Sequence, residues 1–224
     1  MRLNKYISHS GYCSRRDADQ LIEQGFVKVN GTVMTTPYIV KESDIVLVKD
    51  QPILEKPKRK IWIYYKPVGL ITTHRDEKNR PTVFDEEHIK KLGRVISVGR
   101  LDLNSEGLLL LTNDPDFAHM AEKPSNKLKR VYKVRVFGDL DYQQLDALKH
   151  GLTIDGMHYG SIHIECNEQT AKNSWILVTL TEGKNREIRK VLNHVGLEVN
   201  RLIRVSFGEF ELGDLKPGEV KLVK

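Results

Sequence analysis

A carboxylate beside an arginine is the most chemically suggestive feature of the sequence. Asp102 stands two residues after Arg100 and is followed by a polar turn, by Gly107 and by four consecutive leucines. Such an apolar run is typical of a buried strand, and a loop held against a rigid core suits a catalytic carboxylate. On spacing alone an ordinary surface ion pair is the commoner arrangement, so this segment needs further support.

A tyrosine in a later strand is the second candidate. The alternation of apolar and charged residues from Lys129 to Val136 predicts a strand that contains Tyr132. Tyrosine is a good strand residue and often packs half-buried with its hydroxyl outward, so Tyr132 fits a structural role as well as a chemical one.

A basic amphipathic helix is the third candidate, within residues 181–195. Ile188, Val191, Leu192 and Val195 recur at helical spacing, and Arg189 lies at the edge of this apolar stripe, able to reach an internal site. Lys184 and Arg186 fall near the helix start, where free N–H groups favour a phosphate.

Composition narrows the class of protein. The chain of 224 residues carries a net charge of +6 with a pI of about 9.2, which suggests a polyanionic partner. The two cysteines, Cys13 and Cys166, lie far apart, and the histidines are scattered. We therefore expect a reducing compartment and no metal site. The absence of a long apolar span and of a signal peptide predicts a cytoplasmic protein without membrane attachment.

The first 50 residues form a separate module in this interpretation. Two short amphipathic helices precede an Asn30-Gly31 hairpin signal and a strand over residues 45–48, and Ser14 is placed to cap the second helix. Lys5, Arg15, Arg16 and Lys28 could form one basic face, although solvated surface charge explains them equally well. Residues 51–60 are charged and contain two prolines, which is typical of a linker, so we expect the main domain at 61–224.

Strands and helices are both expected in the main domain, which predicts an α+β fold. We expect a mixed, mostly antiparallel sheet with flanking helices, and a cleft between two halves. Strands are predicted over residues 61–65, 95–98, 161–166, 175–180, 202–205 and 207–210, and helices over 117–122, capped by Asp116, and 141–150.

Taken in order, these blocks resemble the RsuA-type family of pseudouridine synthases, preceded by an S4 RNA-binding domain. The S4 resemblance rests on Leu3–Ile7, Ser14–Arg16, Ala18, Leu21-Ile22, Gly25 and Val27–Gly31. The synthase resemblance spans nearly all the remaining chain, through Lys66-Pro67 with Gly69, Gly99–Asp102, Gly107–Asp114, Tyr132, Glu182-Gly183, Ile188–Lys190, Ile203–Val205 with Gly208, and Leu212–Gly218. It implies the pseudouridine synthase fold and conversion of a uridine in folded RNA to pseudouridine, without a cofactor or metal.

The resemblance also implies roles for individual residues. Asp102 is the essential acid, which either attacks the nucleoside or removes a ribose proton. Arg189 is its basic partner, Tyr132 packs on the target base, and Ile188 lines the pocket below the uracil. Arg100 fills the gap left by the flipped uridine. Lys184, Arg186, Lys5, Arg15, Arg16 and Lys28 are the expected RNA-binding residues.

Two positions depart from the family pattern. The turn after the acid reads Asn104-Ser105-Glu106, and Pro115 stands where a glycine usually follows. The implied partner is ribosomal RNA, preferably of the large subunit, or a subunit precursor, bound by a monomer. The alternative is a non-catalytic S4-type ribosome assembly factor, which would leave Asp102, Tyr132 and Arg189 unexplained. A glycoside hydrolase lacks a second carboxylate in a matching motif.

Overall fold

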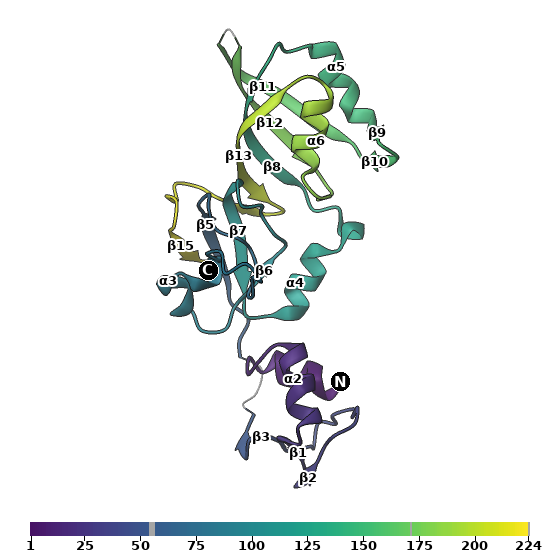
Figure 1. The fold of residues 1–224 in the computed structure, drawn as a ribbon, viewed down its shortest axis with the longest axis vertical. Coiled ribbons are helices and arrows are strands. Elements are labelled where there is room, and N and C mark those ends of the chain that lie inside the picture. The colour runs from purple at the N-terminus through teal and green to yellow at the C-terminus, as the bar shows by residue number, and fades with distance from the viewer. Residues whose placement is uncertain (54–56, 171, 224) are drawn as a thin grey trace. The chain divides into compact units, whose positions relative to one another are not determined.

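Two structural units divide the chain in this computed structural model, which describes residues 1–53, 57–170 and 172–223. One unit comprises Met1–Lys60 with Asn113–Pro115, and the other comprises Ile61–Thr112 with Asp116–Lys224. Figure 1 shows both units along the chain. Part of the expected linker, residues 54–56, lies outside the described residues.

The N-terminal unit contains two helices and a small antiparallel sheet in the order β2-β1-β3-β4. Its elements are α1 (Leu3–His9), α2 (Arg15–Glu23), β1 (Val27–Val29), β2 (Thr32–Val33), β3 (Val46–Val48) and β4 (Gln51–Pro52). As expected, Ser14 caps α2, because its hydroxyl accepts the N–H of Asp17 at 3.1 Å. β4 pairs with β3, so Gln51 and Pro52 extend this sheet.

The described part of the larger unit forms a nine-stranded sheet in the order β11-β12-β8-β13-β7-β5-β15, with β6 on β7 and β14 on β13. Its strands are β5 (Ile61–Lys66), β6 (Ile96–Val98), β7 (Glu106–Thr112), β8 (Arg130–Phe137), β11 (Ile162–Thr170), β12 (Asn173–Leu180), β13 (Glu198–Phe207), β14 (Phe210–Glu211) and β15 (Val220–Leu222). Strands β9 (Leu152–Ile154) and β10 (Met157–Tyr159) form a separate hairpin. Only β7 and β13 pair in parallel within this sheet, which confirms the mixed, mostly antiparallel prediction.

Strand β7 is buried along its whole length, as the four leucines predicted. Leu109 and Leu111 enter a core with residues of β5, β8, β12 and α6 (Glu187–His194), whereas Leu108 and Leu110 enter a second core with α4 (Pro115–Glu122). Because successive strand residues face opposite sides, a strand covered on both faces must be apolar throughout.

The remaining helices are short. They are α3 (Glu87–Lys90), α5 (Tyr142–Ala147), and the 3₁₀ turns η1 (Val83–Asp85), η2 (Pro124–Asn126) and η3 (Leu148–His150). Helix α4 begins at Pro115, two residues earlier than predicted, so Asp116 lies in its first turn and not at its cap. Proline tolerates this position because the first helical N–H has no acceptor within the helix.

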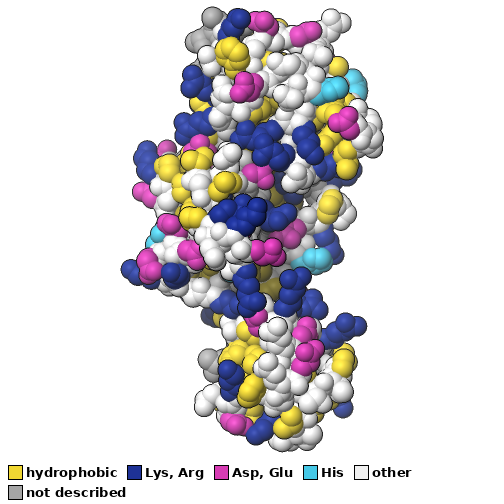
Figure 2. All heavy atoms as spheres, in the orientation of Figure 1, with side chains coloured by type: hydrophobic (Ala, Val, Ile, Leu, Met, Phe, Trp, Pro, Cys, Tyr) yellow, Lys and Arg dark blue, Asp and Glu magenta, His cyan; other side chains and the backbone are white. Residues whose placement is uncertain are grey.

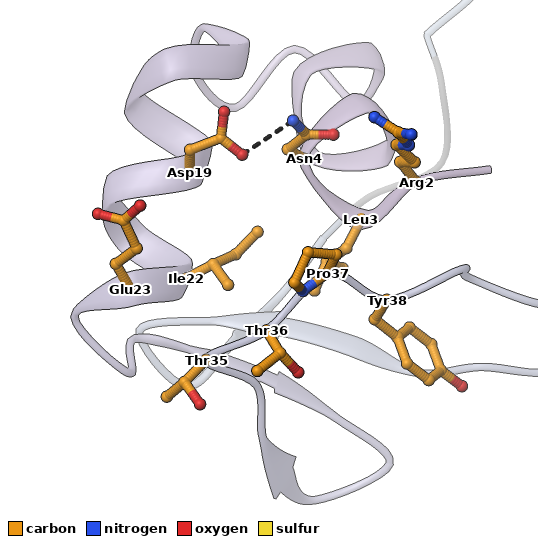
Figure 3. A pocket seen from close by; sticks show the side chains of 10 residues that line it. All are labelled: Arg2, Leu3, Asn4, Asp19, Ile22, Glu23, Thr35, Thr36, Pro37 and Tyr38. Atoms are coloured by element: carbon orange, nitrogen blue, oxygen red, sulfur yellow. Dashed lines mark hydrogen bonds between the residues drawn. The ribbon is translucent and has the colours of Figure 1, made fainter.

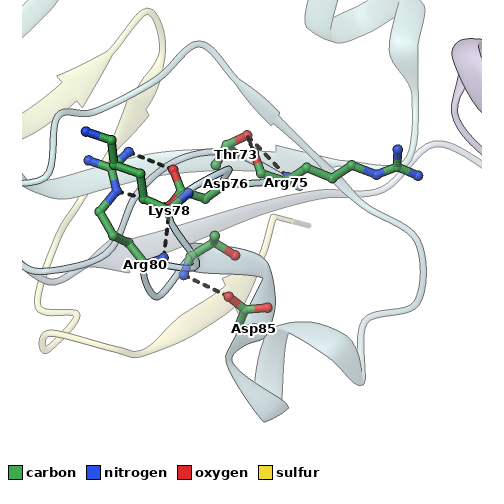
Figure 4. Close-up of polar contacts among 7 residues, drawn as sticks. Thr73, Arg75, Asp76, Lys78, Arg80 and Asp85 are labelled. Carbon is green, nitrogen blue, oxygen red and sulfur yellow. Dashed lines mark hydrogen bonds and ion pairs between the residues drawn. The ribbon is translucent and has the colours of Figure 1, made fainter.

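The polar segment after β5 folds into a defined turn (Figure 4). Asp76 accepts the main-chain N–H groups of Lys78 and Arg80 at 3.2 and 2.9 Å, and the Arg80 guanidinium binds both Asp76 oxygens. The Arg80 bonds lower the pKa of Asp76. The ring of His74 stacks on Phe84 at 3.6 Å between centroids, which fixes the start of this turn.

Candidate active site

In the loop that carries Asp102, the four successive carbonyl groups from Asp102 to Ser105 are hydrogen-bonded. The carbonyl of Asp102 accepts from Ser105 N at 3.0 Å and that of Leu103 accepts from Gly69 N at 2.9 Å. The carbonyl of Asn104 accepts from Arg189 Nη2 at 2.8 Å. Lys66 Nζ donates to the carbonyls of both Asp102 and Ser105, at 3.1 and 2.8 Å. A loop tied in this way presents its side chain in one geometry.

Lys66 ends β5 and is fully buried, with 0% of its surface exposed. Its ammonium donates a third hydrogen bond to its neighbour, the carbonyl of Pro67, at 2.9 Å. Three donors therefore meet three acceptors. Burial lowers the pKa of Lys66 to about 8, against the opposing charges of Asp102 and Glu106. The ammonium is thus protonated at neutral pH.

Arg189 connects α6 to the Asp102 loop. Besides its bond to Asn104, its Nη1 donates to the carbonyl of Val199 at 2.9 Å, and its buried Nε finds no acceptor among the described residues. Burial and the nearby Arg186 lower the pKa of Arg189, whereas the charge of Asp102 raises it. Arg189 was expected to be a partner of the carboxylate. Its hydrogen bonds go to main-chain carbonyls, and its attraction to Asp102 is electrostatic.

The start of β7 is anchored by an ion pair. Arg201 binds Glu106 through two nitrogens, at 2.6 and 3.1 Å, and Tyr65 donates its hydroxyl to the same carboxylate at 3.1 Å. The Arg201 bonds lower the pKa of Glu106 in spite of burial. This cluster fixes the end of the Asp102 loop, since Glu106 directly follows Ser105.

Tyr132 and Ile188 lie in the same hydrophobic core as Leu101, the residue before Asp102. Tyr132 lies on β8 beside Arg204 of β13 and Val178 of β12, and is 8% exposed. Ile188 comes from the first turn of α6. The fold therefore brings Tyr132 of β8 and Ile188 and Arg189 of α6, two distant segments, to the core and loop that flank Asp102.

Arg100 does not form the ion pair with Asp102 that its spacing allowed. Its side chain is exposed, and no cationic side chain of the described residues lies within salt-bridge distance of the Asp102 carboxylate. The neighbouring main chain is tied elsewhere, because Gly99 N donates to Glu122 at 2.8 Å. Arg100 is thus available to a partner, and the Asp102 carboxylate is not occupied by it.

The predicted phosphate site at the start of α6 differs from expectation. Glu187 occupies the first turn and accepts the N–H of Lys184 at 2.8 Å, while the Lys184 ammonium pairs with Glu182. The main-chain N–H of Lys184 is therefore used within the protein, and its ammonium, which has three N–H donors, already has one acidic partner. Arg186 is exposed beside them.

The basic residues of the N-terminal unit lie on its helices and hairpin. Arg15 and Arg16 are exposed at the start of α2, Lys5 is on α1, and Lys28 on β1 pairs with Asp50 at 2.6 Å. On the face seen in Figure 2, Lys and Arg side chains are numerous on both units, with carboxylates between them.

A pocket of about 320 Å³ lies in the N-terminal unit (Figure 3). It is lined by residues of α1, α2 and the segment 35–38, among them Asp19, to which Asn4 donates at 2.8 Å. Lys5, Arg15, Arg16 and Lys28 do not line it. This pocket is therefore separate from the expected RNA-binding residues.

Metal-binding clusters and membrane-spanning helices are both absent from the described ranges. No group of three or more His, Cys, Asp or Glu side chains could hold a metal ion there. No helix of this part of the chain is both long and apolar enough to span a membrane.

Comparison with protein families identifies both units. A model described as RNA pseudouridylate synthase matches residues 60–194, and an S4 domain model matches residues 1–46. The chain belongs to the RNA pseudouridylate synthase family. The resemblance inferred from the sequence is thereby confirmed.

Relatives cover almost the whole chain. An RNA pseudouridine synthase of Rickettsia bellii is 52% identical over 223 residues, covering 99% of this chain and 96% of that protein. The ribosomal large subunit pseudouridine synthase B of Buchnera aphidicola is 38% identical, covering 97% and 90%. A crystal structure of a pseudouridylate synthase, 23% identical, matches the fold with a TM-score of 0.70 and covers 100% and 96%.

Sequence reasoning missed the role of Lys66 and the carboxyl groups of Glu106, Glu182 and Glu187. A lysine at the end of the apolar segment Ile61–Tyr65 was the one available signal, because a strand that enters a core seldom ends on a buried cation. Glu106 and Glu182 gave none, since their partners Arg201, Tyr65 and Gly160 are remote in sequence, and no periodicity marked Glu187, although its partner Lys184 is only three residues away.

Proposed function

We propose that this protein converts a uridine of ribosomal RNA, in the large subunit, to pseudouridine with Asp102 as the catalytic residue. Membership of the synthase family supports the reaction. The relatives named ribosomal large subunit pseudouridine synthase B, from Buchnera aphidicola and from Salmonella typhi at 38% identity each, support the substrate.

The observation that carries the assignment of Asp102 is the hydrogen bonding of its loop. Four successive carbonyl oxygens, from Asp102 to Ser105, accept bonds, and the donors include Lys66, Gly69 and Arg189 from outside the loop. The Asp102 side chain, by contrast, is half-buried and has no hydrogen-bond donor among the described residues. A fixed loop with an unoccupied carboxylate is suited to act on a substrate.

The reaction breaks the bond from C1′ to N1, turns the uracil, and joins C5 to C1′. Asp102 either attacks the nucleoside covalently or removes a ribose proton, and both routes keep the uracil in the pocket. Tyr132 and Ile188 are proposed to contact the base, and Arg189 to hold the Asp102 loop and stabilise its charge. The electron pairs needed come from the substrate and the carboxylate, so the scheme uses no cofactor.

Access to C1′ requires the uridine to leave its stack. Extrusion of a base costs a few kcal/mol, and contacts with phosphates can offset this cost. We propose that exposed Arg100 occupies the space left by the uridine, and that Lys5, Arg15, Arg16 and Lys28 bind the RNA backbone through the S4 unit, with Lys184 and Arg186 contributing near α6.

Replacement of Asp102 tests the catalytic assignment. Asp102→Asn should lower pseudouridine formation at least about 10³-fold while leaving RNA affinity nearly unchanged, because the amide is isosteric but cannot act as a carboxylate. Formation is measured on deproteinised ribosomal RNA and on subunits, with Asp139→Asn, an exposed aspartate of the same unit, as the matched control.

Two outcomes would contradict the proposal. Appreciable activity of Asp102→Asn would remove Asp102 from the mechanism. A wild-type protein that modified neither form of RNA, yet bound it, would favour the assembly-factor alternative. Mapping pseudouridines in total RNA from cells with and without the protein would then identify the uridine.

A further inference from the structure

Glu187 is a buried acid that the proposed mechanism does not use. It is the first residue of α6, directly before Ile188, and only 4% of its surface is exposed. Its Oε2 accepts the main-chain N–H of Lys184 at 2.8 Å. Its Oε1 is buried and receives no donor from the described residues. A buried carboxylate oxygen without a donor is costly, so its protonation state needs an explanation.

Glu182 is the neighbour that explains it. Both of its oxygens receive donors, because Oε1 accepts Gly160 N at 2.7 Å and Oε2 accepts the ammonium of Lys184. The two carboxyl groups meet at Lys184, since Glu187 accepts its main-chain N–H and Glu182 accepts its ammonium, and each acid shifts the pKa of the other. Ionised carboxylates are acceptors only, so a bond between them requires one proton. The proton belongs on Glu187, since Glu182 already has two donors.

Electrostatics agree with this placement. Burial and the neighbouring carboxyl group of Glu182 raise the pKa of Glu187 to about 7. For Glu182 burial acts in the opposite direction to its donors Gly160 N and Lys184, which together lower its pKa. The two carboxyl groups therefore have different pKa values, and below neutral pH they hold one proton between them.

The other charged groups around the pair are Lys184, Arg130 and Arg204. Lys184 lies over the ring of Tyr159 on β10 at 5.9 Å. Arg130 on β8 is attracted by the charge of Glu187 and repelled by that of Arg204 on β13. Its guanidinium donates to the carbonyls of Leu128 and Thr181 at 3.1 and 2.8 Å and so is committed to main-chain acceptors.

We propose that Glu187 is a positioning residue that fixes the start of α6, and with it Ile188 and Arg189, through a proton shared with Glu182. Loss of the proton leaves two negative carboxylates bound to the same lysine, Lys184, and their repulsion displaces the first turn. Arg189 then loses its hydrogen bond to the carbonyl of Asn104, 85 residues away in sequence. The catalytic effect of this positioning rests on the proposed function, whereas the protonation of Glu187 does not depend on it.

The catalytic test compares Glu187→Gln and Glu187→Leu with wild type on ribosomal RNA. From about pH 6 to about pH 7.5, ionisation of Glu187 should lower the wild-type kcat about fourfold. Glu187→Gln donates to Glu182 at every pH, so it should keep the wild-type kcat at the lower pH and lose this decline. Glu187→Leu should have a kcat at least about tenfold lower at both pH values, with KM little changed.

Results of two kinds would overturn the proposal. One is a Glu187→Gln protein with the same fourfold decline as wild type. The other is a Glu187→Leu protein with the wild-type kcat and profile. Glu165→Gln, an exposed glutamate of the same unit, controls for a change in surface charge.

A second measurement separates this proposal from the proposed function. Because folding raises the pKa of Glu187 from 4.5 to about 7, its contribution to stability is lost as pH rises through that window. The thermal midpoint of wild type should therefore fall relative to Glu187→Gln between these pH values. If neither protein makes pseudouridine, the proposed function fails, and this comparison alone decides. Parallel midpoint curves would overturn the shared proton.

Discussion

At the scale of single residues, Lys66 is a buried cation that binds the Asp102 loop directly. A buried ammonium normally has a carboxylate as its partner, but Lys66 donates to three carbonyls, of Pro67, Asp102 and Ser105. The charges of Asp102 and Glu106 compensate at longer range. Lys66 therefore joins the end of β5 to the loop that carries Asp102.

Replacing Lys66 by methionine should lower both stability and activity. Each carbonyl left buried without a donor costs about 1–3 kcal/mol, so we expect a loss of about 2–4 kcal/mol in the free energy of unfolding. A misplaced Asp102 should lower kcat about 100-fold. Urea unfolding and pseudouridine formation measure these effects. Lys90→Met, at an exposed lysine paired with Glu87, should change the stability by less than about 0.5 kcal/mol.

Lys66 also predicts a decline of activity above about pH 8, where the neutral amine has two N–H groups for three carbonyls. Since folding lowers the pKa of Lys66 from 10.5, the unfolded chain binds the extra proton from about pH 8 to 10.5, and this group makes the folded state more stable as pH rises. Unfolding driven by Lys66 thus cannot explain the decline. The residual activity of Lys66→Met should not decline above about pH 8. A decline as large as that of wild type would contradict the role of the Lys66 ammonium in holding the Asp102 loop.

At the scale of elements, the parallel pairing of β7 with β13 decides where the Asp102 loop ends. Glu106 pairs with Ile203 and Gly107 with Arg204. A Cβ at Gly107 would collide with the main chain of Arg204, and the φ of Gly107 is +101°, which side chains rarely adopt. Glycine is therefore required for the approach of the two strands.

Gly107→Ala should destabilise the protein by about 3 kcal/mol, because the strands must separate and the backbone is strained. The matched control is Gly156→Ala, in the β9–β10 turn, where φ is also positive, at +79°, but no atom lies within 4 Å of the added Cβ. Strain alone should cost it about 1 kcal/mol. Denaturant unfolding compares the two, and equal losses would show that close packing at Gly107 is unimportant.

At the scale of the whole molecule, each unit has its own hydrophobic core. Residues such as Leu3, Ile7 and Val27 form the core of the N-terminal unit, whereas Leu109 and Val134 belong to that of the larger unit. Exposed charges in one unit can therefore be changed without repacking the other. This independence permits RNA binding to be tested apart from catalysis.

Arg15→Gln combined with Arg16→Gln should weaken RNA binding about tenfold at moderate salt and reduce the salt slope of log K by about two, since two phosphate contacts are lost. The kcat at saturating RNA should not change. Filter binding at several salt concentrations and steady-state kinetics measure these quantities. Lys41→Gln, at an exposed lysine outside the predicted face, is the control; an equal effect would mean that general charge, not the α2 face, binds the RNA.

Local sequence patterns determined much of this protein. The spacing of Ile188, Val191 and Leu192 predicted α6, the leucine run predicted β7, and Ser14 predicted the cap of α2. These features depend on neighbours within about one turn or one strand, where side-chain direction follows the backbone. The motifs around Asp102, Tyr132 and Arg189 also sufficed to indicate the family.

Only the tertiary structure decided what holds the site together. The bonds from Lys66 to Asp102 and Ser105 join residues 36 and 39 apart, and that from Arg189 to Asn104 joins residues 85 apart. The tertiary structure likewise placed Glu187 near Glu182 and left Arg100 without the ion pair to Asp102 that its spacing allowed. Sheet order and register set these contacts, and no local periodicity encodes which distant carbonyl or carboxyl group a buried side chain will meet.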